Sequence, residues 1–345
     1  MASHRRPKQP SRARVTVLTT AAAAAVAISS QAANAAPSEK PSKDEVKAKV
    51  DKLYQEAEQA TEKYNGAKEK QEKLQKEIST IQDNVARGQE DLNEMRDSIG
   101  LAAAAQYRTG SMDSSVQLFL SSDPDDYLDK ASTLDQLSSQ QVESLKKIQD
   151  KQRELAQDRA EATEKLKDLA STRTELGNKK KEVQDKLAEA QKLLNTLTAQ
   201  EKAALTAEQE RASRSSERTA LGSGAPASGR AAAAYAAAQS KIGSPYVWGA
   251  AGPNSFDCSG FTSWAFAQAG VSIPRVSQDQ AMIGTRINSV ADLKVGDLVL
   301  FANDLHHVGF YAGNGQILHS PRTGAYVRYE SMKTIGEPFR WGVRV

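Results

Sequence analysis

A long heptad repeat constrains the fold of this chain more than any other feature. From Val46 to Gln106, alternating steps of four and three residues mark eighteen positions, of which fifteen are apolar. Such a stripe keeps one side of a helix against a partner helix, as in a coiled coil. The surrounding region, residues 38–218, is also poor in Pro and Gly and rich in Glu, Lys, Gln, Ala and Leu. We therefore predict a long helix here.

A second stripe of the same kind runs from Leu134 to Ala204, with fourteen of twenty-one positions apolar. Turn-forming residues, among them Gly110 and Pro124, separate the two stripes. This arrangement predicts an antiparallel coiled-coil hairpin, with a parallel homodimer of one continuous helix as the alternative. The apolar piece 116–120 falls at the hairpin tip, where it either caps the tip or binds a partner.

The first 35 residues have the pattern of a secretory signal. A basic start that includes Arg5 and Arg14 precedes an apolar run from Val15 to Ile28, and a small-x-small motif, Ala-Asn-Ala, ends at residue 35. The apolar run is shorter than the roughly 20 residues that a membrane-spanning helix needs. We expect export and cleavage, after which the protein is secreted and is not an integral membrane protein.

Loss of the signal changes the charge of the chain. The whole sequence has 46 Lys and Arg against 43 Asp and Glu, a net charge of +3, and removal of five basic residues leaves −2. A weakly acidic mature chain gives no reason to expect a nucleic-acid partner. Residues 222–229 then read Gly-Ser-Gly-Ala-Pro-Ala-Ser-Gly, which is typical of a flexible tether.

The composition predicts four regions. They are the signal (1–35), the helical region (36–220), the linker (221–229) and a C-terminal domain (230–345). In the last region, helices are expected at 231–242 and from 258 onward, and short strands at 297–302, 307–312, 316–320, 325–329 and 339–343. Helices followed by an antiparallel sheet indicate an α+β fold, and about 115 residues are enough for one core.

The single cysteine, Cys258, is the most informative residue. One cysteine in an exported chain is either an inert buried residue or a reactive thiol. Asp257 is suited to cap the helix that follows, so Cys258 is expected in its first turn. There the helix dipole favours a thiolate, and the free backbone N–H groups can hold an oxyanion.

Three histidines lie outside the signal: His306, His307 and His319. In a strand only one of the adjacent pair can face the site, and His319 on a neighbouring strand can orient it. A cysteine, a base and an orienting group are the parts of nucleophilic catalysis. The histidines lack a spacing typical of zinc ligands, so we expect neither a catalytic metal nor a cofactor.

Three stretches resemble the NlpC/p60 family of cell-wall cysteine peptidases. They are residues 243–249 (Gly-Ser-Pro-Tyr-Val-Trp-Gly), 257–261 (Asp-Cys-Ser-Gly-Phe) and 307–311 (His-Val-Gly-Phe-Tyr), with His319 following. Their order and gaps also match. The resemblance covers residues 230–345 and implies a papain-like α+β domain. It further implies hydrolysis of peptidoglycan stem peptides, usually at the bond between the γ-carboxyl of D-glutamate and a diamino acid.

The resemblance also implies roles for individual residues. Cys258 corresponds to the nucleophile and His307 to the base, because the His-Val-Gly-x-Tyr frame selects His307 over His306. His319 corresponds to the third polar residue. The hydroxyl of Tyr246 is expected near the thiolate.

Further residues are candidates for contacts with the stem peptide. Asp257 and Ser259 flank the nucleophile and are expected to touch the substrate. Three arginines are weaker candidates for binding its free carboxylate: Arg275, Arg286 and Arg322.

The helical half is similar in architecture to wall hydrolases controlled by the FtsE–FtsX transporter at division sites. The resemblance includes the region from Tyr107 to Leu120. It implies a role in wall remodelling or cell separation, an FtsX-like membrane partner at the hairpin tip, and restraint of the catalytic domain by the second arm or the linker. Two alternatives stay open: a cysteine amidase that cuts the sugar–peptide bond, and a scaffold whose C-terminal domain only binds wall.

Overall fold

The structure is a computed structural model that describes residues 41–108, 116, 124–218 and 229–345. The predicted signal, nearly all of the hairpin tip and the linker up to residue 228 lie outside the described residues. Gly229, which we expected at the end of the linker, begins a helix. Among the described helices, none has both the length and the apolar character needed to cross a membrane.

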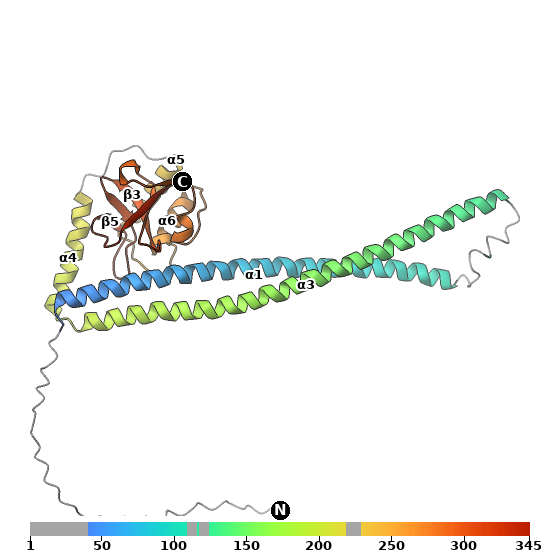
Figure 1. Ribbon diagram of the computed structural model, residues 1–345, viewed down its shortest axis with the longest axis horizontal. Helices are drawn as coiled ribbons and strands as arrows, with labels where there is room; N and C mark the ends of the chain where they lie inside the picture. Colours follow the sequence, from blue (N-terminus) through green and yellow to red (C-terminus); the bar gives the residue numbers. More distant parts are fainter. Residues whose placement is uncertain (1–40, 109–115, 117–123, 219–228) are drawn as a thin grey trace, which may run out of the picture. The chain divides into compact units, whose positions relative to one another are not determined.

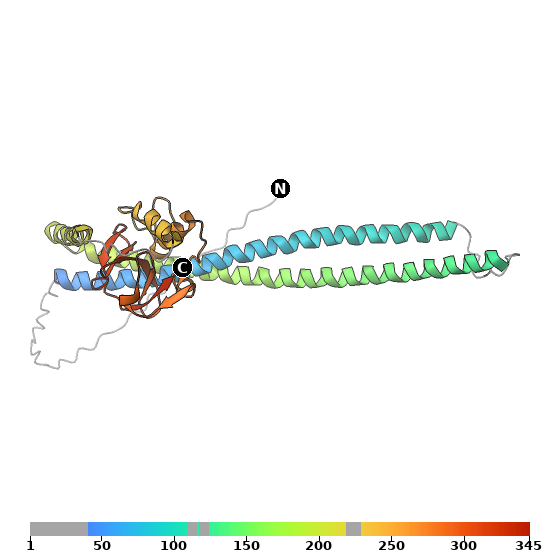
Figure 2. The same cartoon turned by 90° about the horizontal axis from the view of Figure 1, so that it is seen from above.

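Two long helices, α1 (Lys43–Arg108) and α3 (Pro124–Asn195), lie side by side (Figures 1 and 2). Ion pairs link them at several levels: Glu56–Lys186, Glu77–Lys165 and Asp91–Lys151. Residue numbers rise along one helix as they fall along the other. The two helices are therefore antiparallel, as the sequence predicts.

The predicted stripes supply the contact between these helices. Buried stripe positions on α1 include Val46, Val50, Leu74, Ile78 and Leu92, and those on α3 include Leu155, Leu169, Val183 and Ala190. Arg173 and Lys180, polar members of the second stripe, are exposed. The stripe on α3 is thus the thinner of the two.

The second arm ends earlier than predicted. α3 stops at Asn195, and a separate helix, α4 (Ala199–Arg218), follows. A capping box begins α4, because the backbone N–H of Glu201 donates to Thr198 Oγ1 and the N–H of Thr198 donates to the Glu201 carboxylate at 2.8 Å. The expectation that the second stripe continues to Ala204 in one helix was wrong. α4 instead leaves the hairpin and contacts the C-terminal sheet.

The C-terminal region is the predicted α+β domain. Helix α5 (Gly229–Gln239) packs against α6 (Cys258–Gln268), and six antiparallel strands follow in the order β1-β6-β2-β3-β4-β5. The strands are β1 (Thr285–Ile287), β2 (Leu298–Phe301), β3 (His307–Gly313), β4 (Gln316–His319), β5 (Arg328–Ser331) and β6 (Phe339–Arg344). Two short helical turns complete it: α7 (Ser277–Gln280) and η1 (Val290–Asp292).

An aromatic cluster holds α6 on the sheet. The rings of Phe261 and Phe266 on α6 lie 5.9 and 5.6 Å from the ring of Phe310 on β3. All three side chains are fully buried, and burying a Phe side chain contributes about 1.5–3 kcal/mol. This packing fixes the start of α6 near the start of β3, where the candidate site lies.

One strand differs clearly from its prediction. β5 was expected at 325–329 but begins at Arg328, whereas four other strands agree within one residue. The N–H of Tyr246 donates to the carbonyl of Ala325, and the N–H of Val327 donates to the carbonyl of Ser244. The segment before β5 therefore pairs with the loop that precedes α6. Neither β1 nor α7 was predicted, because elements of three or four residues are too short to show a period.

Candidate active site

Cys258 is the first residue of α6, as predicted. The Asp257 carboxylate accepts a hydrogen bond from the backbone N–H of Gly260 at 2.6 Å and so caps the helix. The first turn of a helix has backbone N–H groups without partners inside the helix. Local sequence thus places the sulfur where an anion is favoured.

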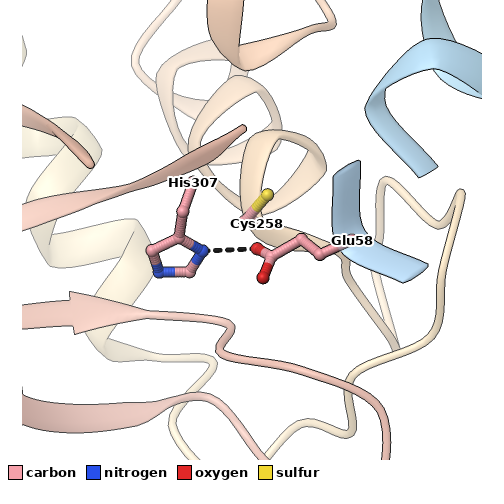
Figure 3. A group of neighbouring side chains, drawn as sticks. All are labelled: Glu58, Cys258 and His307. Carbon is pink, nitrogen blue, oxygen red and sulfur yellow. Dashed lines mark hydrogen bonds and ion pairs between the residues drawn. The ribbon is translucent and has the colours of Figure 1, made fainter. Parts of the chain in front are cut away.

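His307, the first residue of β3, brings an imidazole to this sulfur. Cys258 Sγ, a ring nitrogen of His307 and a carboxylate oxygen of Glu58 all lie within 4.8 Å of one another (Figure 3). His307 Nε2 is 2.8 Å from Nδ1 of His319 on β4. The Nδ1 atom of His307 contacts Glu58 and is the nitrogen available to the thiol. The structure therefore brings Cys258, His307 and His319 together.

The hydrogen-bonded chain continues beyond the predicted residues. His319 Nε2 lies 3.3 Å from the carboxylate of Glu330 on β5, and Arg328 donates to the same carboxylate at 2.6 and 3.0 Å. Burial lowers the pKa of His319 to about 4, so this imidazole is neutral at pH 7. Its Nε2–H can then donate to Glu330 while its Nδ1 accepts from His307, which fixes the tautomer.

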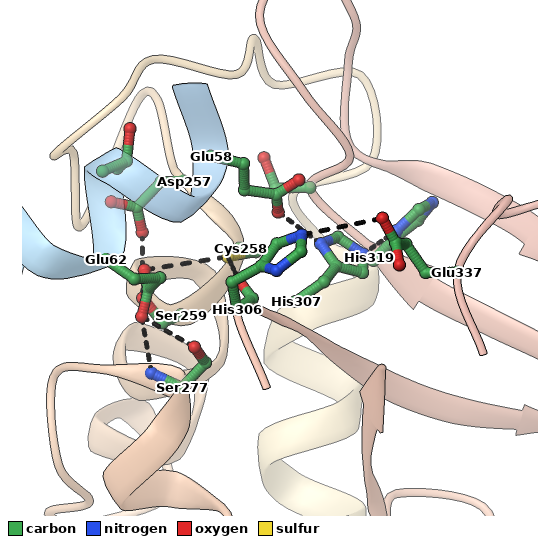
Figure 4. Close-up of polar contacts among 12 residues, drawn as sticks. Glu58, Glu62, Asp257, Cys258, Ser259, Ser277, His306, His307, His319 and Glu337 are labelled. Atoms are coloured by element: carbon green, nitrogen blue, oxygen red, sulfur yellow. Dashed lines mark hydrogen bonds and ion pairs between the residues drawn. The ribbon is translucent and has the colours of Figure 1, made fainter. Parts of the chain in front are cut away.

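His306, the other member of the doublet, has its ring directed elsewhere. Its Nδ1 contacts the Asp304 carboxylate, and its Nε2 lies 3.9 Å from Glu337 (Figure 4). Only its backbone carbonyl faces the site, 3.5 Å from Cys258 Sγ. Strand alternation separates the two neighbours, as expected.

Tyr246 is buried, with 6% of its surface exposed. Burial raises the pKa of Tyr246 well above its ordinary value, and the negative charge of Glu58 raises it further. Its phenol therefore stays protonated.

Asp257 and Ser259 are tied together by Arg275. The guanidinium donates to both carboxylate oxygens of Asp257, at 3.0 and 2.6 Å, and to the Ser259 hydroxyl at 2.8 Å. A bidentate pair of this kind is rigid as well as strong. Of the three arginines considered above, Arg275 alone reaches these two residues.

The other two arginines lie elsewhere. Arg286 stacks on Trp341, with the guanidinium carbon 3.8 Å from the ring centre. Arg322 pairs with Asp51 of α1 at 3.0 Å and lies over the ring of Tyr54. Neither is positioned beside the thiol.

One face of α1 covers the site (Figure 4). Glu62 lies 3.9 Å from Cys258 Sγ, and its carboxylate accepts from the Ser259 hydroxyl at 2.6 Å. It also accepts from the backbone N–H and the hydroxyl of Ser277, at 2.6 and 2.8 Å. One turn earlier, Glu58 contacts Nδ1 of His307.

Asn65 adds a third contact from the same helix face. Its amide donates to the Asp257 carboxylate at 3.0 Å. Residues 58, 62 and 65 follow the i, i+4, i+7 spacing that places side chains on one face of a helix. These three contacts come from the first arm, whereas we expected the second arm or the linker to restrain the domain; α4, which includes the end of the second predicted stripe, contacts β5, and the linker up to residue 228 lies outside the described residues.

The cover reverses the expected state of the thiol. Burial raises the pKa of the Cys258 thiol well above its ordinary value, and the carboxylates of Glu62 and Glu58 raise it further. Cys258 is fully buried. We had expected a depressed pKa, but desolvation and neighbouring negative charge outweigh the effect of the helix N-terminus. In this arrangement the nucleophile is a thiol.

The covering carboxylates are perturbed as well. Burial raises the pKa of Glu62 to about 7, and the Asp257 carboxylate adds to the shift. Burial acts to lower the pKa of His307, but the Glu58 carboxylate outweighs it, and the pKa of His307 lies above its ordinary value. The cover is therefore held by charged hydrogen bonds in a buried setting.

The site as a whole defines a class of protein. A cysteine at a helix start, with an imidazole from an adjacent strand and a second polar group behind it, is the arrangement of a cysteine-nucleophile hydrolase. Residues 243–343 match the sequence model of the NlpC/P60 family. This part of the chain is therefore an NlpC/P60 domain.

Known proteins are similar to the same region. A probable endopeptidase of Corynebacterium glutamicum is 48% identical over 120 residues, which are 35% of this chain and 56% of that protein. The probable endopeptidase p60 of Listeria innocua is 44% identical over 112 residues, 32% of this chain and 22% of that protein. This chain thus spans only about half the length of the Corynebacterium relative and 22% of the length of the Listeria relative.

A solved structure is similar as well. The crystal structure of the NlpC/p60 domain of the peptidoglycan hydrolase SagA is 36% identical, with 33% of this chain and 98% of that chain covered and a TM-score of 0.31.

Proposed function

We propose that this chain is a cysteine endopeptidase that cleaves peptidoglycan stem peptides at the bond between the D-glutamate γ-carboxyl and the diamino acid. The observation that carries the proposal is the position of Cys258 Sγ. It lies at the start of α6 and within 4.8 Å of a ring nitrogen of His307, whose other nitrogen is held by His319. The names of the relatives, probable endopeptidases and a peptidoglycan hydrolase, support the same class of substrate.

The geometry supports a two-step acyl transfer. Nδ1 of His307 takes the thiol proton, and the Cys258 sulfur attacks the γ-carbonyl carbon. The resulting oxyanion is held by backbone N–H groups at the start of α6. When the C–N bond breaks, His307 returns the proton to the leaving amine of the diamino acid. Water activated by His307 then hydrolyses the thioester and releases the carboxylate and the thiol.

The other residues predicted from the sequence assist this reaction. His319 holds the tautomer of His307, and the phenol of Tyr246 helps to place the substrate or to stabilise the oxyanion. Asp257 and Ser259, fixed by Arg275, contact the stem peptide on the side that Glu62 and Asn65 now fill.

We further propose that the arrangement described is a closed, self-inhibited state. Glu58 and Glu62 fill the space next to the sulfur, and Glu58 contacts the nitrogen that must accept the thiol proton. A stem peptide therefore has to displace α1 before it can reach Cys258. The raised pKa of the thiol supports the same interpretation, because a protonated thiol is a weak nucleophile.

A closed enzyme needs a signal that opens it. We propose that the hairpin tip binds an FtsX-like membrane partner and that this contact draws α1 away from the site. The protein would then act outside the cell, in the wall, during remodelling or cell separation. Removal of the tip, residues 109–123, should abolish activation by the partner while leaving the catalytic domain intact.

Digestion of purified peptidoglycan tests the activity. Residues 36–345 carrying Glu58→Gln and Glu62→Gln should release fragments whose masses show cleavage after D-glutamate, and the same protein with Cys258→Ala should release none. An amidase would instead release whole stem peptides from the sugar chain. Full cleavage by the Cys258→Ala protein would exclude the mechanism, and wall binding without any cleavage would favour the scaffold.

A further inference from the structure

We propose that Glu58, Cys258 and His307 form an inhibitory zinc site that locks α1 onto the catalytic centre. The inference rests on the closed state proposed above, since one ligand comes from α1 and two from the peptidase domain. It concerns a regulatory ion only, and the catalytic steps require none.

The donor atoms suit zinc by type and position. Thiolate sulfur, imidazole nitrogen and carboxylate oxygen are the three kinds of ligand that zinc takes in proteins. Here one of each lies within 4.8 Å of the others, and all three side chains are buried. Bond lengths of roughly 2.0–2.3 Å require donors about 3.3–3.6 Å apart, so the sulfur has to approach while Glu58 and His307, now in direct contact, separate by about 1 Å. Magnesium and calcium prefer oxygen ligands alone.

The imidazole is already prepared to bind a metal. Nε2 of His307 contacts Nδ1 of His319, and Nε2 of His319 in turn contacts the carboxylate of Glu330. Metal-binding histidines almost always donate their second N–H to a carboxylate, a backbone carbonyl or water, which fixes the ring, and here an imidazole held by a carboxylate takes that place. Nδ1, which contacts Glu58, is then the ring atom left to bind a metal once any proton on it has been lost.

The charge of the surroundings favours a dication. Besides Glu58, the carboxylates of Glu62 and Asp257 lie close to the sulfur, and the positive groups that face them are Arg275 and the imidazole of His307. Burying several carboxylates beside a thiol is costly unless cations compensate for them. A zinc ion offsets this excess negative charge and stabilises the thiolate.

Zinc binding would inhibit in two ways. The ion displaces the thiol proton of Cys258, and any proton on Nδ1 of His307, to solvent, so that nucleophile and base are both occupied. It also adds a metal–carboxylate bond to Glu58 and thereby holds α1 in place. The sequence gives no hint of such a site, because Glu58 is 200 residues away from Cys258.

Cobalt is the probe that tests the site without measuring activity. Metal-free protein comprising residues 36–345 is titrated with Co²⁺, and Zn²⁺ is then added in competition. We expect a thiolate-to-cobalt charge-transfer absorption that Zn²⁺ removes and that is missing in Cys258→Ser. In Glu58→Ala the affinity for Zn²⁺ should fall at least about tenfold. The matched control is Glu90→Gln, an exposed residue of the same helix that contributes neither a donor nor a contact to the site, and it should bind within about twofold of the unaltered protein.

Two results would overturn the proposal: no charge-transfer absorption in the unaltered protein, or equal Zn²⁺ affinity with and without Glu58. Circular dichroism of each variant shows that it is folded. Cleavage of peptidoglycan in the presence of a chelator separates this proposal from the proposed function. If metal-free protein carrying Glu58→Gln and Glu62→Gln fails to cleave but the cobalt spectrum of the unaltered protein is as expected, the activity is wrong and the metal site stands. If cleavage occurs but the charge-transfer absorption is missing, only the proposed metal site is wrong.

Discussion

The sulfur of Cys258 is subject to two opposing influences. The start of α6 favours a thiolate, whereas full burial and the carboxylates from α1 favour the neutral thiol and raise its pKa. Both influences weaken with distance. The start of α6 is fixed in the core of the domain, whereas the cover and the carboxylates from α1 can be removed. In the closed state that we propose, the reactivity of this residue therefore depends on whether α1 is in place.

His319 acts through His307, and its replacement tests that role. In the Glu58→Gln/Glu62→Gln background, His319→Gln should lower kcat about 10²-fold, because the base loses its fixed tautomer. KM should change less than about twofold, since His319 is behind His307 and not beside the substrate. Steady-state kinetics on a stem-peptide substrate measure both constants.

The matched control for that change is His306→Gln. The ring of His306 contacts Asp304 and lies near Glu337, not His307 or His319, so kcat should stay within about threefold of its reference. Equal losses in the two variants would contradict the assignment of His307 and His319 to the site.

Two faces of α1 contact different parts of the protein. Its apolar stripe packs along α3, whereas Glu58, Glu62 and Asn65 project from another face toward the peptidase domain. A single rigid helix thus joins the hairpin to the catalytic centre. The sequence predicts the first face from its period but gives no sign of the second.

Weakening the second face should activate the enzyme. Charged hydrogen bonds contribute about 1.5–3 kcal/mol each, and 1.4 kcal/mol corresponds to a factor of ten in an equilibrium. In the presence of a chelator, Glu58→Gln/Glu62→Gln should therefore raise the rate of peptidoglycan cleavage at least about tenfold. The control is Glu90→Gln, an exposed residue of the same helix. An unchanged rate in the double variant would count against closure by α1.

The sequence predicted most of the catalytic residues but not the residues of α1 that cover them. Motif spacing identified Cys258, His307 and His319, and the structure brings them together. Glu330 was missed because its contact with His319 depends on the register of β5, which pairs His319 with Arg328 and Ile317 with Glu330. Glu58 and Glu62 were missed because charged residues outside an apolar stripe resemble an ordinary solvent-exposed face.

The two errors in the predicted bounds of helices and strands have different causes. The end of α3 could have been predicted, since Thr198 and Glu201 form a capping box that the apolar stripe obscured. The shift of β5 could not, because Ala325 and Val327 form backbone hydrogen bonds with a loop about 80 residues earlier. Contacts between distant segments leave no period in the sequence.

At the scale of the whole chain, the peptidase domain is held by more than the catalytic contacts. Arg322 pairs with Asp51 of α1, Gln59 contacts Asp304, and α4 packs against β5. These contacts lie around the site, and several of them are polar. Such a surface suits reversible closure better than a large apolar interface does.

Separation of the two halves tests closure at this scale. Residues 230–345 alone should cleave peptidoglycan at least about tenfold faster than residues 36–345, because the contacts with α1 are lost. Addition of residues 36–220 as a separate chain should slow the isolated domain again. Equal rates for the short and long proteins, both shown to be folded by circular dichroism, would remove the idea of self-inhibition.

The spacing of Glu58, Glu62 and Asn65 also determines how the site opens. The three side chains lie on one face of α1, so a rotation of the helix about its own axis would turn all of them away from the site together. About 46 residues, or roughly 70 Å of helix, separate Glu62 from the far end of α1. A partner that twists the distant end could therefore expose the sulfur in one step, without touching the peptidase.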